Sequence, residues 1–278
     1  MAHQHLTVHA DHVDRALRAW LRPHVDTLQN TWPALTAPTP DAEQVHEARV
    51  ALRKMRAAWA LVRGLPHTAP AAALPDLVLL FRHLGAHRDA DVTRELLIQT
   101  LGPRWAARVQ SAPNPTAQPP ASLHKFKTAV DALAAWVHAE PPLAERTHCD
   151  VRRHCKQRLA HWHRAICRAS RHPGSLEVET LHEIRKRLKR LRYALEFIAR
   201  DMKLDARKPY LKALSATQTA LGLLNDLHTA ALACQAPHAP PHADQTTAVA
   251  VLKHRLTLAH QQAIEELARW RQLRPPWA

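Results

Sequence analysis

The chain has 278 residues and a strongly positive charge, with 39 Lys and Arg residues against 24 Asp and Glu and a formal net charge of +15. This excess predicts a polyanionic partner: a nucleic acid, an anionic membrane surface or polyphosphate. The four cysteines form no Cys-x-x-Cys pair and no secretory signal precedes them, so we expect no disulfide framework and a cytoplasmic location. No run approaches the roughly 18 apolar residues that a membrane helix needs, so no membrane span is expected.

Alanine and leucine are abundant, glycine is scarce and alternating β-branched runs are missing, so we predict an all-α fold. The proline-rich segment 111–120 is predicted to link a first half, 1–110, to a second half, 121–278. In chain order, the predicted helices span 9–28, 44–63, 76–101, 104–110, 123–138, 145–170, 176–202, 210–235 and 246–273.

The segment 45–62 recurs without a gap as 181–198. Each copy has apolar residues at the i, i+3, i+7 spacing of a helix with one buried face. Two copies of one helix indicate an internal duplication and hence two pseudo-symmetric helical bundles. The apolar stripes consist of Val45, Ala48, Leu52, Met55, Trp59 and Val62 in the first copy and of Leu181, Ile184, Leu188, Leu191, Leu195 and Ile198 in the second.

Basic residues form a second stripe along the flank of each apolar stripe. Like charges at i, i+4 cost a helix a few tenths of a kcal/mol per pair, roughly, so folding alone gives no reason to stack them. A solvated face with snorkelling Lys and Arg stems is one interpretation. We favour a binding surface because the same side of the helix is charged in both copies. The stripes consist of His46, Arg49, Arg53 and Arg56 in the first copy and His182, Arg185, Lys189 and Arg192 in the second, which Lys186 and Arg190 widen.

A Leu-Gly-x-x-x-Asp sequence follows each basic helix at nearly the same distance, with Gly85 and Asp89 in the first half and Gly222 and Asp226 in the second. A glycine within a helix costs about 1 kcal/mol against alanine, so we expect these two glycines to permit a close approach between helices. The two aspartates have two interpretations. They orient a basic side chain of the site, or they are ordinary ion-pair or capping residues.

The helices that precede the two basic helices also correspond, although their alignment needs an insertion or deletion. Arg15 and Arg18 align roughly with Arg153 and Lys156. We predict an outer tier of the basic site from Arg18 and Lys156, with ordinary surface charge as the alternative interpretation.

These residues resemble the CHAD family, the conserved histidine α-helical domain. The resemblance covers most of the chain. Each motif is weak alone, but four in the right order, paired across two halves, are specific. The motifs are the runs 46–56 (HEARVALRKMR), 84–92 (LGAHRDADV), 182–193 (HEIRKRLKRLRY) and 221–226 (LGLLND).

The resemblance implies two helical bundles around a basic central cleft or pore, non-catalytic binding of inorganic polyphosphate, and association with polyphosphate granules. The chain departs from the usual family pattern at Lys54, where arginine is more typical, but a lysine still supplies a point charge for phosphate. The family is often fused to a CYTH barrel, which is not recognisable here, so its chemistry is not expected. Carried over by position, the anion site comprises His46, Arg49, Arg53, Lys54, Arg56, His182, Arg185, Lys186, Lys189, Arg190 and Arg192.

Sequence-nonspecific RNA or DNA binding is the main alternative. Base stacking usually places aromatic residues among the basic ones, whereas only Tyr193 lies close to a basic motif, so a ligand without bases fits better. A phosphohydrolase is less favoured because no phosphate-cradling glycine loop and no nucleophile–base set is found. A metal-sequestering module is also less favoured, because the histidines lack a clean metal-ligand spacing. We expect no cofactor and no metal, and no oligomeric state is predicted.

Overall fold

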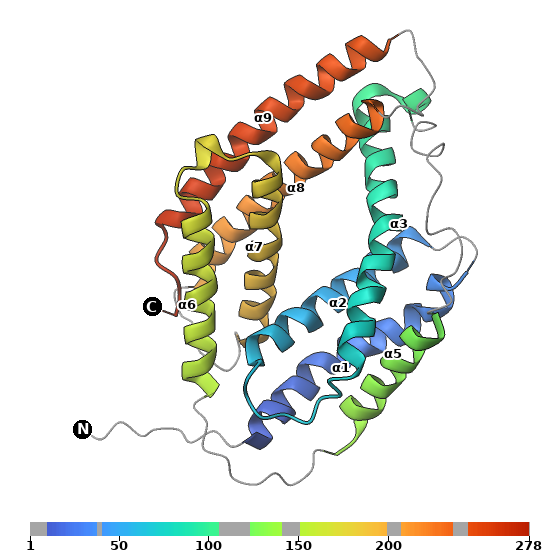
Figure 1. The fold of residues 1–278 in the computed structure, drawn as a ribbon, viewed down its shortest axis with the longest axis vertical. Helices are drawn as coiled ribbons and strands as arrows, with labels where there is room; N and C mark the ends of the chain where they lie inside the picture. The colour runs from blue at the N-terminus through green and yellow to red at the C-terminus, as the bar shows by residue number, and fades with distance from the viewer. Residues whose placement is uncertain are drawn as a thin grey trace. The chain divides into compact units, whose positions relative to one another are not determined.

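The computed structural model describes residues 10–37, 41–105, 123–140, 151–198, 207–235 and 244–277 (Figure 1). These residues form helices and their connections and include no strand, so the all-α prediction is confirmed. The elements are α1 (Ala10–Leu35), α2 (Ala42–Val62), α3 (Ala73–Leu101), η1 (Pro103–Trp105), α5 (Leu123–His138), α6 (Val151–Ala169), η2 (Pro173–Ser175), α7 (Val178–Ile198), α8 (Arg207–Gln235) and α9 (Gln245–Gln272).

The predicted helices correspond to those of the structure, with shifts at their ends. The α5 helix has the predicted bounds, and α3 continues without a break through Gly85. The α1 helix extends past the predicted end to Leu35 although Pro23 and Pro33 lie inside it. Proline removes an amide donor and usually kinks or ends a helix. Here the buried face continues through Leu28 and Leu35, so packing sustains the helix beyond both prolines. The predicted helical stretches 106–110, 145–150 and 199–202 lie outside the described residues.

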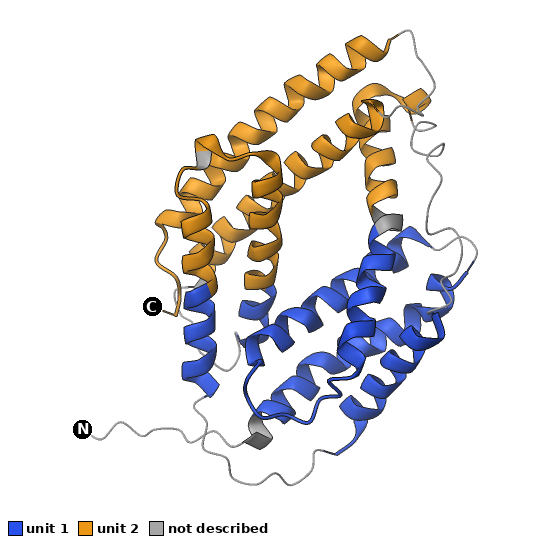
Figure 2. Ribbon diagram, viewed as in Figure 1, with its two compact units in different colours: residues 1–85, 116–161, 193–203 blue, residues 86–115, 162–192, 204–278 orange. Residues whose placement is uncertain are grey.

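The packing divides the chain into two units (Figure 2). Unit 1 comprises residues 1–85, 116–161 and 193–203, and unit 2 comprises residues 86–115, 162–192 and 204–278. In unit 1, α1 packs against α2 and α5; in unit 2, α8 packs along α9. Each unit contains residues from both halves of the sequence. This division into packing units therefore differs from the predicted division of the sequence at 111–120. That predicted linker lies outside the described residues.

Both apolar stripes of the repeated helix are buried, as predicted. All six stripe residues of α2 and all six of α7 belong to the core, and Leu52 and Leu188 at their centres are 1% and 0% exposed. Burying a leucine side chain contributes about 1.5–3 kcal/mol, so these stripes hold each helix in one rotational setting. The basic flank of each helix is therefore fixed by the core beside it.

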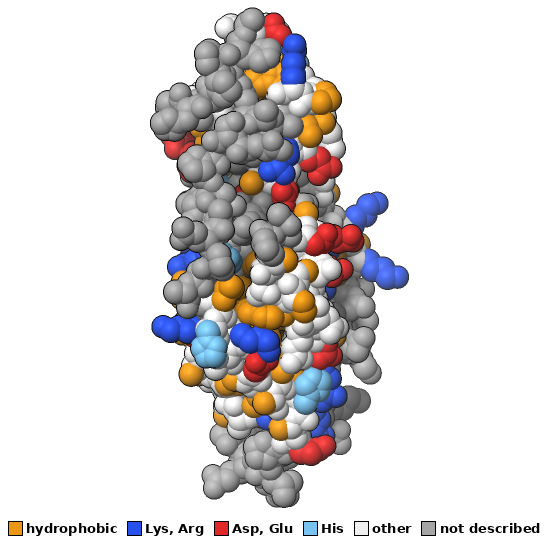
Figure 3. Space-filling model, turned by 90° about the vertical axis from the view of Figure 1, so that its right-hand side faces the viewer, with side chains coloured by type: hydrophobic (Ala, Val, Ile, Leu, Met, Phe, Trp, Pro, Cys, Tyr) orange, Lys and Arg blue, Asp and Glu red, His pale blue; other side chains and the backbone are white. Residues whose placement is uncertain are grey.

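In the described part of the chain, no helix combines the length and hydropathy needed to span a membrane. Figure 3 shows one face of the molecule, on which Lys and Arg side chains are interspersed with Asp and Glu. The excess of positive charge is not gathered on that face.

Candidate anion-binding surfaces

In unit 1, the basic stripe of α2 surrounds an aromatic ring of α3. The guanidinium carbons of Arg49, Arg53 and Arg56 lie 4.9, 5.6 and 4.7 Å from the centre of the Phe81 ring. Arg49 also donates a hydrogen bond to the Phe81 carbonyl oxygen, at 3.2 Å. A cation near an aromatic face is attracted by the ring quadrupole, worth about 0.5–1 kcal/mol at exposed sites. One half-buried ring thus gathers three guanidinium groups.

The arginines of unit 1 repel one another. Burial lowers the pKa of Arg56, and the positive charges of Arg82 and Arg53 lower it further. Three guanidinium groups thus lie within 5.6 Å of one ring centre. The cluster is therefore a concentration of positive charge that an anion would stabilise.

The other residues predicted for the first half of the chain have different positions. His46 is exposed at the beginning of the stripe, and Asp89 is exposed on the part of α3 that belongs to unit 2. Lys54 lies near α1, where the pKa of His24 falls to about 4, first because of burial and second because of the Lys54 charge. Lys54 therefore belongs to the side of α2 that approaches α1, away from the ring of Phe81.

In unit 2, the histidine of the α7 stripe is held by a chain of side chains. The Nδ1 atom of His182 contacts Oδ1 of Asn225, and Nδ2 of Asn225 donates to Oδ1 of Asp226 at 3.1 Å. A carboxylate only accepts hydrogen bonds, so the amide group of Asn225 must face Asp226 and its oxygen must face His182. Asp226 is thus linked to His182 through Asn225, and its role in orienting a side chain of the site stays a prediction.

The arginines of α7 lie against α8, but without an aromatic ring between them. Arg192 donates to Oε1 of Gln218 at 3.3 Å, and Nε2 of Gln218 donates to the carbonyl oxygen of Leu188 at 2.9 Å. Gln218 lies four residues before Gly222, as Phe81 lies four before Gly85, so the two residues occupy equivalent positions. A buried amide in unit 2 replaces the ring of unit 1.

The other basic residues of α7 differ in their surroundings. Arg190 stacks on the ring of Trp162 in α6, with its guanidinium carbon 4.6 Å from the ring centre. Lys186 forms an ion pair with Glu183, which lowers the pKa of that carboxyl group. Lys189 is half-buried within the stripe. Lys186 thus has a carboxylate partner one turn away, whereas Arg190 lies towards α6.

Both helix glycines lie under an arginine of the preceding basic helix. A Cβ atom added at Gly85 would lie 2.7 Å from NH1 of Arg49, and one added at Gly222 would lie 3.7 Å from NH2 of Arg185. The close approach expected at these glycines is thus made by an arginine side chain. In unit 1 the added Cβ atom would force the arginine side chain to shift, whereas in unit 2 it would make an ordinary contact.

Arg18 has a position that does not suit the predicted outer tier. It is 5% exposed, stacks on Trp136 at 4.2 Å and donates to the carbonyl oxygens of Trp136 and Ala139 at the C-terminal end of α5. Its other terminal nitrogen donates to Asp14 and Thr68. These partners use the guanidinium to join α1 to α5, so we leave Arg18 out of the site. Lys156 is half-buried on α6, and its role stays a prediction.

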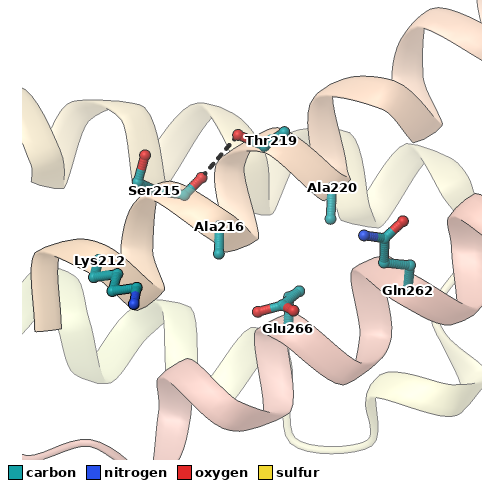
Figure 4. Close-up of a pocket in the computed structure, with 7 residues that line it drawn as sticks. All are labelled: Lys212, Ser215, Ala216, Thr219, Ala220, Gln262 and Glu266. Atoms are coloured by element: carbon teal, nitrogen blue, oxygen red, sulfur yellow. Dashed lines mark hydrogen bonds between the residues drawn. The ribbon is translucent and has the colours of Figure 1, made fainter. Parts of the chain in front are cut away.

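A shallow pocket lies between α8 and α9 of unit 2, away from the basic stripe (Figure 4). Its volume is about 520 Å³, and its polar lining includes Lys212, Thr219 and Glu266. Glu266 accepts a hydrogen bond from Arg269 at 2.7 Å. One lysine opposed by one glutamate does not provide the excess of positive charge that a polyanion requires.

Comparison with known proteins identifies the fold family. The family model for the CHAD domain matches residues 19–235. The chain belongs to the CHAD family. The CHAD fold is also seen in the similar crystal structure of the CHAD domain from the plant Ricinus communis, with a TM-score of 0.70 and 26% identity over 99% of this chain and 97% of that chain.

A second solved structure, PptA from Streptomyces chartreusis, is similar to this CHAD protein with a TM-score of 0.57 and 15% identity, over 90% of this chain and 97% of that chain. At that identity, the likeness shows the fold alone. No curated protein matches the chain. The predicted CHAD resemblance is confirmed by the family match and by the Ricinus communis structure.

Proposed function

We propose that this CHAD protein binds inorganic polyphosphate without catalysis, through the basic stripes of α2 and α7. The observation that carries the proposal is the gathering of Arg49, Arg53 and Arg56 around Phe81. Arginine presents a planar fork of donors to phosphate oxygens, and lysine presents a mobile point charge. The stripe of α7, with His182, Arg185, Lys189 and Arg192, supplies the second set of donors.

The surroundings of the Phe81 ring favour a ligand without bases. Proteins that bind single-stranded nucleic acids stack bases on exposed aromatic faces. The ring of Phe81 is half-buried and has three guanidinium groups within 5.6 Å of its centre. These groups occupy the approach to the ring, so a phosphate chain that needs only cationic donors fits this surface better than RNA does.

The test is a direct comparison of ligands at equal charge. Long-chain polyphosphate and single-stranded RNA of the same total charge are titrated against the full chain at physiological salt, and the dissociation constants are compared. We expect tighter binding of polyphosphate. Tighter binding of RNA would favour the nucleic-acid alternative, because phosphate contacts alone attract both ligands.

The same sample tests the non-catalytic role. Polyphosphate incubated with the protein, with and without added Mg²⁺, should keep its length distribution on a gel. Progressive shortening that scales with protein concentration would instead indicate a phosphohydrolase. In a cell, a protein that only binds the polymer would associate with cytoplasmic polyphosphate granules, which fluorescence microscopy of a tagged chain can check.

A further inference from the structure

Arg82 follows Phe81 on α3 and lies outside the sequence motifs of the basic helices. Its side chain is exposed, and its charge is close enough to Arg56 to lower the pKa of that group. Arg53 and Arg56 are three residues apart on α2 and therefore share one face of that helix. Arg82 brings a third cation to them from a different helix.

We propose that Arg53, Arg56 and Arg82 form a three-guanidinium clasp for one phosphate group, and that Phe81 is the residue that positions it. The proposal rests on the proposed function and assigns to Arg82 a phosphate contact of its own. The ligand class is a phosphate unit within polyphosphate or a short oligophosphate such as tripolyphosphate.

The ring of Phe81 explains how such a clasp is held ready. A free arginine side chain has considerable rotamer entropy to lose on binding. Contact with the ring restricts Arg53 and Arg56 before the ligand arrives, at guanidinium-to-ring distances of 5.6 and 4.7 Å. Guanidinium groups held over a ring keep their N–H edges available for oxygen acceptors. The two arginine side chains have therefore lost part of their rotamer entropy in the free protein, so less entropy is lost when phosphate binds.

The internal repeat supplies a natural contrast. The positions of unit 2 equivalent to Phe81 and Arg82 are Gln218 and Thr219. Gln218 is 9% exposed and bonds the backbone of α7, and the hydroxyl group of Thr219 donates to the carbonyl oxygen of Ser215 in its own helix. At these two positions unit 2 therefore has neither an aromatic ring nor a cation, and we place the clasp in unit 1.

The first experiment removes the third cation. Binding of tripolyphosphate and of long-chain polyphosphate is measured for the full chain, for Arg82→Gln and for the control Arg63→Gln, which removes one exposed charge at the C-cap of α2. We expect Arg82→Gln to weaken both ligands about tenfold, the loss of one charge-assisted contact. Its salt dependence should also become shallower. Arg63→Gln should stay near the wild type.

The outcomes separate this inference from the proposed function. Binding by the wild type with equal affinities for Arg82→Gln and Arg63→Gln would overturn the clasp and leave polyphosphate binding in place. A wild type that binds neither phosphate ligand would overturn both. Arg82 is exposed, so its replacement leaves the core intact and the result can be interpreted.

The second experiment tests the positioning role of Phe81. Phe81→Leu keeps an apolar side chain but removes the aromatic face, whereas Phe81→Tyr keeps the face. We expect Phe81→Leu to weaken tripolyphosphate binding several-fold, in line with the loss of cation–π contacts. Phe81→Tyr should bind tripolyphosphate with the affinity of the wild type. Equal affinity of folded Phe81→Leu and wild type would overturn the positioning role. Circular dichroism checks the fold; if Phe81→Leu unfolds, failure of Phe81→Tyr to bind like the wild type overturns that role instead.

Discussion

The two units place the same helix motif in different surroundings. In unit 1, three arginines of α2 lie around the Phe81 ring, and Arg82 adds to their charge. In unit 2, the equivalent position is Gln218, which accepts from Arg192 and donates to the backbone of α7. A ring attracts several cations at once without using their N–H donors, whereas an amide oxygen takes up a donor directly.

The difference shows that a repeated motif need not give two equal half-sites. The stripe residues are similar in type, but the helix that packs beside them decides whether their donors are available. In unit 1, three guanidinium groups lie around one aromatic ring. In unit 2, Arg192 donates to an amide oxygen and Lys186 forms an ion pair with a carboxylate. We therefore expect unit 1 to contribute more of the binding free energy.

The largest effect should come from removing stripe cations in pairs. We expect Arg49→Ala with Arg53→Ala to weaken polyphosphate binding by about 100-fold or more, because charge-assisted contacts contribute about 1.5–3 kcal/mol each. Arg185→Ala with Lys189→Ala should weaken it less, because lysine lacks the bidentate fork. The quadruple variant should show no binding. Titration calorimetry measures the affinities.

Circular dichroism is the control for these variants, since the four side chains flank the apolar stripes and their loss should leave helicity unchanged. An unfolded quadruple variant would mean that the residues serve the fold. Larger losses from the unit 2 pair than from the unit 1 pair would contradict the ranking of the two surfaces.

A smaller effect should distinguish the two glycines. Gly85→Ala places a Cβ atom 2.7 Å from the Arg49 guanidinium, so that group must move, and we expect affinity to fall by about threefold to tenfold, part of one charge-assisted contact. Gly222→Ala makes an ordinary contact at 3.7 Å with Arg185. It should keep its affinity and gain up to about 1 kcal/mol of stability from the better helix former. Binding titrations and thermal unfolding of both variants test this, and equal affinities would remove the predicted asymmetry.

The last effect concerns pH and the stability of the fold, and involves no ligand. The pKa of His24 is lowered from 6.5 to about 4, first by burial and second by Lys54. As the pH falls, this histidine thus takes up a proton at a higher pH in the unfolded chain than in the folded chain. Stability from His24 is complete above pH 6.5 and is lost as pH falls towards 4, with a slope of at most about 1.4 kcal/mol per pH unit.

Denaturant unfolding of the wild type and of His24→Gln at several pH values between 4 and 6.5 measures this effect. The difference between the two proteins isolates His24 from the other histidines, among which His154 and His163 also have lowered pKa values because of burial. In the loose sequence alignment of the helices that precede the two basic helices, the residue equivalent to His24 is Trp162, and tryptophan does not titrate. Parallel pH profiles for the two proteins would show that His24 has no such role.

Much of the fold was predictable because helical periodicity is local. The stripes of α2 and α7 follow from residues three and four apart, and all twelve apolar members are buried. The basic flank follows from the same pattern. The bounds of α1 were less predictable, because prolines inside a helix are tolerated only when packing beyond them is sufficient.

The environment of the site was not predictable from local pattern. Arg18 looked like a member of a basic tier, but its partners Trp136 and Ala139 lie more than 100 residues away along the chain. Phe81 and Arg82 lie outside the four motifs. Both were missed because their importance depends on which side chains of α2 pack against α3. The Leu-Gly motif that follows was the available signal, since it marks where α3 passes closest to an arginine of α2.

The chain of contacts from Asp226 through Asn225 to His182 has a consequence for energetics. Because the Asn225 oxygen can only accept, Nδ1 of His182 carries the hydrogen, and in the neutral ring Nε2 has a lone pair. The hydrogen bond to Asn225 thus stabilises one tautomer and one orientation of the ring, so a ligand that needed the other tautomer would first have to break this bond.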